Sequence, residues 1–198
     1  ATPADADPAK ALAVRQAAAD LIDRDKLSEQ VYKGTYTPLY SFVPDGLTGA
    51  TESLKGLYGD NEGGADPARA AKRLADAGVQ TPVVLNLQYA GERYGAASAE
   101  EYAQIKAQLE TDGLFTVNLQ STEWGQFTKD RVEDMYPAHQ LGWFPDYSDA
   151  DNYLTPFFLP ENFLGNHYEN TEVNDLILKQ AVEPDAATRT AAIAKIQQ

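Results

Sequence analysis

Two well-marked helices, each followed at once by an alternating apolar segment, constrain this fold more than any other feature of the sequence. "DPARAAKRLADAG" has Asp66 as a cap, Pro67 in the first turn and Gly78 as a stop, and "TPVVLNLQY" follows it. "SAEEYAQIKAQLETDG" carries the capping-box pair Ser98 and Glu101, and "LFTVNLQ" follows it. Because helices that alternate with strands are typical of α/β domains, we expect an α/β fold.

The two predicted strands each place apolar residues on one face. These are Val83, Leu85 and Leu87 in the first strand, and Phe115, Val117 and Leu119 in the second. "HQLGW" predicts a further strand. Helical spacing predicts helices from Pro8, over "DRDKLSEQVY" with Asp23 or Asp25 as cap, over "STEWGQFTKDRVEDMY", over "TEVNDLILKQAV" from Thr171, and after Asp185. Residues 45–64 carry six glycines and predict a long surface loop.

Composition excludes several classes of function. The 198 residues carry a net charge of −14, which repels nucleic acid and anionic lipid, so neither is an expected partner. The absence of cysteine rules out disulfides and thiolate nucleophiles, and the two distant histidines, His139 and His167, do not favour a zinc site. No apolar run reaches the ~20 residues of a membrane span, and we expect no signal peptide within these 198 residues. We expect no cofactor and no metal.

The stretch "GWFPDYSDADNYLTPFF" combines acids with aromatic rings. A calcium loop does not fit, because Tyr153 stands where the next oxygen ligand belongs. Asp149 is expected to cap a short helix that Pro156 ends. Asp146 follows the strand predicted over "HQLGW", where α/β proteins bind ligands. It could pair with a cation beside the rings, or it could be a loop aspartate that accepts backbone N–H groups.

Six segments, in order, resemble the peptide/nickel (family 5, oligopeptide- and dipeptide-type) solute-binding proteins of ABC transporters. They are "VRQAAADLIDRDKL", "TPLYSFVPDG", "ADPARAAKRLADAG", "VNLQSTEWGQF", "LGWFPDYSDADNYLTPFF" and "NHYENTEVNDLILKQA". The resemblance implies a periplasmic-binding-protein-like (type II) lobe. We expect a mixed sheet of about four to six strands, the usual size, flanked by helices. It covers only the second lobe of a larger two-lobed protein, so residues 1–198 are expected to be a single lobe. The start without methionine and the end inside a helical pattern fit a fragment.

The resemblance also implies a function. Family members close around a solute, a small peptide or another small solute such as an oligosaccharide, and deliver it to an ABC permease, without catalysis. They work outside the cytoplasm, in the periplasm or lipid-anchored on the outer face of the cytoplasmic membrane. The resemblance places Asp146 at the acid that pairs with a peptide amine, Trp143 at a pocket wall and Trp124 at a second wall. Phe144 and Tyr147 adjoin Asp146 as further candidates.

Two points of the resemblance leave alternatives open. Gln140 stands where oligopeptide binders can carry a basic residue near the ligand, which puts a clamp for the peptide carboxylate in doubt. Stacked tryptophans suit sugars as well as peptides. The alternative is therefore a carbohydrate-binding or carbohydrate-active protein, in which Asp146 and Asp149 flank a sugar held on aromatic platforms.

Overall fold

The computed structural model describes residues 7–198, which divide into two compact units. Unit 1 contains the described residues up to Pro38 together with Gly56–Gly142, and unit 2 contains Leu39–Lys55 together with Trp143–Gln198. Each unit has an apolar core of its own. A short 3₁₀ turn, η2 (Lys55–Leu57), lies where the chain passes from unit 2 back into unit 1.

Unit 1 contains the alternating helices and strands that the sequence predicts. Its elements are α1 (Pro8–Leu21), α2 (Arg24–Gln30), α3 (Pro67–Asp76), β1 (Val83–Tyr89), α4 (Ser98–Leu109), η3 (Thr111–Gly113), β2 (Phe115–Ser121), α5 (Trp124–Val132) and β3 (Ala138–His139). The predicted α/β class is confirmed.

The sheet of unit 1 is smaller than the sequence led us to expect. Its order among the described residues is β2-β1-β3 and both pairs are parallel, so the prediction of a mixed sheet of four to six strands is wrong. β1 pairs with β2 over its whole length, but β3 pairs only at Leu87↔Ala138 and Gln88↔His139. The predicted "HQLGW" strand ends at His139 because the chain turns away after Gln140, whose N–H donates to the Gln88 carbonyl at 2.8 Å.

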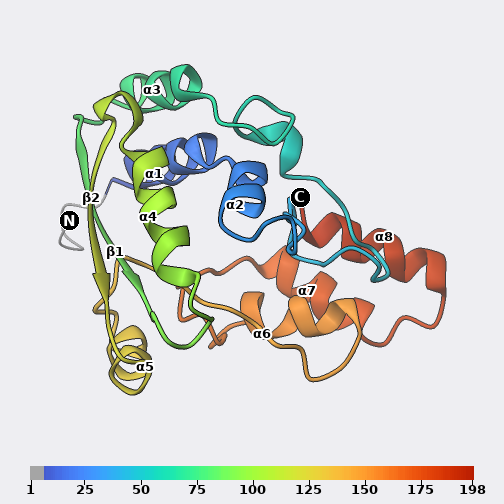
Figure 1. Ribbon diagram of the computed structural model, residues 1–198. Helices are drawn as coiled ribbons and strands as arrows, with labels where there is room; N and C mark the ends of the chain where they lie inside the picture. The colour runs from blue at the N-terminus through green and yellow to red at the C-terminus, as the bar shows by residue number, and fades with distance from the viewer. Residues whose placement is uncertain (1–6) are drawn as a thin grey trace. The chain divides into compact units, whose positions relative to one another are not determined.

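The core of unit 1 lies between one face of the sheet and the helices α1, α3 and α4, which Figure 1 shows on the same side of β1 and β2. Phe115 and Val117 are buried on this face with Leu87, as the alternation predicts, and Val83, Leu85 and Leu119 pack against the same core. Residues on the other face, such as Val84 and Asn86, are exposed.

Most of the predicted helix caps are present in unit 1, and one is wrong. The side chains of Asp23 and Asp66 accept N–H groups from the first turns of α2 and α3. The Ser98–Glu101 capping box does not form, because α4 begins at Ser98 itself and so leaves no cap position for its hydroxyl. Glu101 instead accepts a hydrogen bond from the Tyr32 hydroxyl at 2.8 Å, which joins α4 to the chain after α2.

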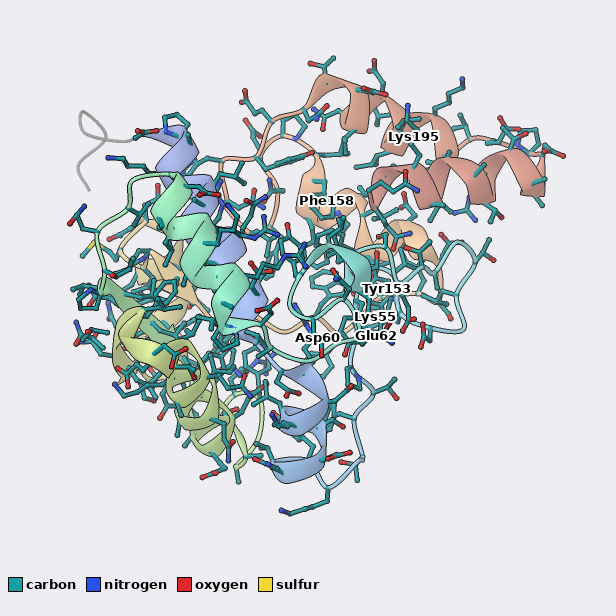
Figure 2. The ribbon with its side chains drawn as sticks, turned by 90° about the horizontal axis from the view of Figure 1, so that it is seen from above. Lys55, Asp60, Glu62, Tyr153, Phe158 and Lys195 are labelled. Carbon is teal, nitrogen blue, oxygen red and sulfur yellow. The ribbon has the colours of Figure 1, made fainter. Side chains whose placement is uncertain are left out.

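The glycine-rich segment of unit 1 is less exposed than predicted. Gly59 and Gly63 are buried, and the Gly59 N–H donates to the Asp20 carboxylate of α1 at 2.9 Å. Asp60 and Glu62 lie in the same loop (Figure 2), where an Asp60 carboxylate oxygen accepts the N–H groups of Glu62 and Gly64. This part of the predicted surface loop is therefore a folded turn that is attached to α1.

Unit 2 is built from short helices and turns, and the described part of it contains no strand. Its elements are η4 (Ala150–Tyr153), α6 (Thr155–Phe158), α7 (Thr171–Gln180) and α8 (Ala186–Ile196). Figure 2 labels Phe158 at the end of α6 and Lys195 on α8. The core contains Val43, Leu154, Ile177 and Ile193.

The caps of the two long helices in unit 2 differ in how well the sequence predicted them. Asp185 caps α8 as predicted. The cap of α7 is Asn170 rather than Thr171, because the extended backbone of Asn170 (φ −151°) lets its side chain accept the Val173 N–H.

Candidate functional site

The loop that carries Asp146 rests on η4, which is attached to α8 through Asp149. The Asp149 side chain caps η4 by accepting the Asp151 N–H at 2.8 Å, as predicted. It also receives two hydrogen bonds from the Arg189 guanidinium, at 2.6 and 3.0 Å. The hydrogen bonds from Arg189 hold the pKa of Asp149 below its ordinary value. Asp149 is therefore an ion-paired structural carboxylate.

Asp151 attaches the same turn to α7. Its Oδ1 accepts hydrogen bonds from the fully buried Gln180 amide at 2.6 Å and from the Thr155 hydroxyl at 2.8 Å. Its Oδ2 accepts the Tyr147 hydroxyl at 2.9 Å. Hydrogen bonding with Asn152 lowers the pKa of Tyr147, but the hydrogen bond to Asp151, burial and the nearby acidic charges outweigh it and raise that pKa.

Pro156 does not end the η4 turn, which corrects the sequence prediction. It lies in the first turn of α6, where the absence of an N–H costs nothing. The ring of the next residue, Phe157, packs edge-on against Trp143 with ring centroids 5.0 Å apart, and Phe163 packs against the same indole at 5.4 Å. Trp143 is therefore held by its neighbours within unit 2.

Four of the five predicted site residues lie in this one loop of unit 2: Trp143, Phe144, Asp146 and Tyr147. Phe144 and Tyr147 are 68% and 52% exposed, and Asp146 is exposed as well. The Asp146 backbone N–H donates to Asn152 Oδ1 at 2.9 Å, while its carboxylate has no hydrogen bond or ion pair with the described residues of unit 2. An exposed carboxylate beside rings is suited to a cation that carries apolar groups.

One premise of the Asp146 prediction needs correction. The strand that was expected to end just before this loop ends at His139, and residues 140–145 separate it from Asp146. The position of Asp146 is therefore set by η4 and not by the end of a strand.

The fifth predicted residue, Trp124, belongs to unit 1 and begins α5. Its backbone N–H donates to Glu92 at 2.6 Å, and its indole stacks on the buried Phe127 with centroids 5.6 Å apart. The Arg93 guanidinium lies over the indole, 4.9 Å from the ring centroid. One indole thus combines a ring surface with a nearby positive charge.

Two residues of these sites escaped the sequence reasoning. Arg93 lies in the "AGERYG" segment after β1, and only the distant Trp124 reveals its place. Asn152 looked like part of a short helix, although it contacts both Trp143 and Asp146.

Gln140 is buried and its amide oxygen accepts the Ala90 N–H at 3.3 Å, so it holds the backbone of unit 1.

The described residues also bear on metal and membrane chemistry. Within residues 7–198, no group of three or more His, Asp or Glu side chains is placed to hold a metal ion. None of the helices described in that range is long and apolar enough to span a membrane.

Comparison with known proteins gives the family. Residues 3–165 match the family described as bacterial extracellular solute-binding proteins, family 5 middle. The chain belongs to this family. Family 5 proteins bind solutes and are not enzymes.

Among curated proteins, this family 5 chain is 24% identical to the oligopeptide-binding protein OppA of Bacillus subtilis, over 98% of its own length and 36% of the relative. It is 22% identical to the dipeptide-binding protein of Escherichia coli, over 73% of its length and 26% of the relative. The chain therefore spans about a third of the length of such relatives, or less.

Solved structures of family 5 proteins share the fold. DppA from Helicobacter pylori in complex with the peptide STSA gives a TM-score of 0.81 at 21% identity, over 96% of this chain and 36% of that one. OppA from Haemophilus influenzae in complex with RPPGFSPFR gives 0.78 at 22% identity, over 100% of this chain and 38% of that one.

Proposed function

We propose that this chain is one lobe of a two-lobed solute-binding protein that binds peptide-like solutes and delivers them to an ABC permease. The observation that carries the proposal is the family match, together with relatives named for oligopeptide and dipeptide binding. A periplasmic relative in Haemophilus influenzae and the family description support a place outside the cytoplasm. The remaining lobe would come from the length that the relatives have and this chain does not cover.

Asp146 is proposed to bind the α-amine of the solute. Its backbone is held by Asn152, and its carboxylate is not committed to a partner in unit 2. Trp143, Phe144 and Tyr147 would contact the apolar parts of the same end of the solute. Because closure of a cleft excludes water, this ion pair would be much stronger than one on an open surface.

Trp124 of unit 1 is proposed as a further ligand-binding residue, as the resemblance implies. Its indole offers apolar surface, and the Arg93 guanidinium lies over it, 4.9 Å from the ring centroid.

The carbohydrate-active alternative is weakened by Asp149. A glycosidase needs two available carboxyl groups, and Asp149 is bound by Arg189 and by the turn that it caps. Binding of an uncharged sugar is one outcome that the test below distinguishes, because aromatic rings can bind sugars without a charged partner.

The test is calorimetric titration of the whole protein with a dipeptide in two forms, free and N-acetylated. Asp146→Asn should weaken binding of the free form by about a few hundredfold or more and change that of the N-acetylated form little.

Asp66→Ala is the control: it removes the cap of α3 in unit 1, and we expect a loss of stability with little change in affinity. A parent protein that binds oligosaccharides and none of the dipeptides would contradict the proposal. So would an Asp146→Asn variant that binds the free dipeptide as tightly as the parent does.

A further inference from the structure

Asn152 joins two residues of the Asp146 loop through a single atom. It is 4% exposed, and its Oδ1 accepts the Trp143 indole N–H at 3.2 Å and the Asp146 backbone N–H at 2.9 Å. Both partners are donors, so the side-chain atom that faces them has to be the carbonyl oxygen. The Asn152 oxygen therefore accepts one hydrogen bond from the Trp143 ring and one from the Asp146 backbone.

The backbone just before Asp146 cannot donate a hydrogen bond of its own, because Pro145 has no N–H. Phe144, Asp146 and Tyr147 are exposed, so burial does not hold these three side chains in place. The two hydrogen bonds to Asn152 hold the Trp143 indole and the Asp146 backbone, and the hydrogen bond from Tyr147 to Asp151 holds the next side chain.

Asn152 is itself held by longer helices. It lies in η4, which Asp149 connects to Arg189 of α8 and Asp151 connects to the buried Gln180 of α7. A binding residue on a loop is precise only when a supporting shell fixes it to rigid elements. The contacts run from α7 and α8 through η4 to Asn152, and from Asn152 to Asp146.

We propose that Asn152 is the positioning residue of this site: its Oδ1 holds the Asp146 backbone and the Trp143 indole in the arrangement that binds the solute amine. The inference rests on the proposed function of Asp146. Asn152 does not touch the solute, and its effect on affinity passes through the two residues that it holds. A residue that only stabilised the fold would not discriminate between an amine-bearing solute and an acetylated one.

The first experiment needs no solute. The 198-residue chain has two tryptophans, so its ligand-free form gives two indole N–H signals by NMR. The signal that disappears in Trp124→Phe belongs to Trp124, and the other belongs to Trp143. The Trp143 indole proton should exchange slowly with solvent, and Asn152→Leu, which is similar in size but has no acceptor, should shift its resonance and speed its exchange. Asn152→Asp keeps an oxygen at the same place and should preserve the slow exchange. Fast exchange of the Trp143 indole proton in the parent protein would overturn the proposal. This measurement decides the question even if no Asn152 variant folds.

The second experiment titrates the whole protein with the free and the N-acetylated dipeptide. Asn152→Leu should weaken binding of the free dipeptide by about tenfold or more and that of the acetylated one by less than about threefold. Asn152→Asp should bind both within about threefold of the parent.

The matched control is Asn170→Leu, which removes the cap of α7 at the opposite end of that helix from Gln180, and it should leave both affinities unchanged. Equal losses for the two solutes with Asn152→Leu, or no loss from a folded variant, would overturn the positioning role. If the parent binds neither dipeptide, the proposed function fails, while the exchange measurement still decides whether Asn152 holds the loop.

Discussion

Asp20 is a buried charge that connects α1 with α3 and with the loop before α3. It is 0% exposed, accepts the Gly59 N–H, and pairs with Arg73 of α3 at 2.5 Å. Arg69 lies at 3.6 Å from the same carboxylate. One carboxylate of α1 thus accepts hydrogen bonds from an arginine of α3 and from a backbone N–H of the loop before α3.

We predict that Asp20→Ala lowers the free energy of unfolding by about 2–4 kcal/mol, because it leaves a buried N–H and a partly buried guanidinium without their acceptor. Urea denaturation measures this. Asp76→Ala is the control: its pair with Lys72 is 64% and 74% exposed and should change stability by about 0.5 kcal/mol or less. A loss of equal size in both variants would contradict the role given to Asp20.

Glu101 is a second residue with an unusual environment. Burial raises its pKa above the ordinary 4.5, although the hydrogen bond from Tyr32 opposes the shift. As pH rises above 4.5, the unfolded chain loses this proton first, so the free energy of unfolding falls until the folded carboxyl also ionises.

Glu101→Gln removes this titration and keeps an acceptor for Tyr32. We expect the variant to match the parent below about pH 4 and to be more stable than the parent at neutral pH, with the difference appearing as pH rises above 4.5. Thermal unfolding over a pH series checks the sign. A variant that is less stable than the parent at neutral pH would show that the charged hydrogen bond outweighs burial.

At the scale of elements, side chains at the end of α4 and at its C-cap cover Val117 on the outer edge of β2, which is an edge strand among the described residues. Both backbone groups of Val117 are occupied: its N–H donates to Glu110 at 2.9 Å and its carbonyl accepts from Lys106 at 2.5 Å. Lys106 and Glu110 also pair with each other at 2.8 Å. Charged residues over an edge strand hinder the addition of another strand.

We predict that the double variant Lys106→Ala/Glu110→Ala self-associates through this edge, because the Val117 N–H and carbonyl become available to a second chain. Sedimentation velocity over a concentration series measures it. Lys72→Ala/Asp76→Ala, which removes an ion pair of the same helical spacing from α3, should behave like the parent. A monomeric Lys106/Glu110 variant would mean that the rest of the edge is protected in some other way.

At the scale of the whole molecule, the chain is two compact units that together span about a third of the length of its relatives. We predict that the 198-residue chain binds a free dipeptide far more weakly than the whole protein does. A clamp excludes water from both sides of the solute, and a single lobe leaves polar groups solvated and rings half covered. Calorimetric titration of the chain alone that gave sub-micromolar affinity would contradict this.

The sequence by itself determined the local elements of this protein. Caps such as Asp23, Asp66 and Asp185, and the alternation in β1 and β2, depend on residues within one turn or one strand, so they can be read from the chain. The resemblance added the family and the candidate residues. Ser98 and Thr171 were predicted as caps incorrectly because each is the first residue of its helix, a shift of one position that propensities do not resolve.

Only the tertiary structure decided how those elements support one another. The length of β3 depended on where the chain leaves the sheet after Gln140, which no local pattern reports. Asp149 receives its ion pair from Arg189, 40 residues away, and Arg93 lies over Trp124 from a different loop. Asn152 is recognisable as a positioning residue only when one buried oxygen is seen to accept from both Trp143 and Asp146. Such contacts arise from packing between distant segments, so the same residues look like ordinary loop and helix positions in the sequence.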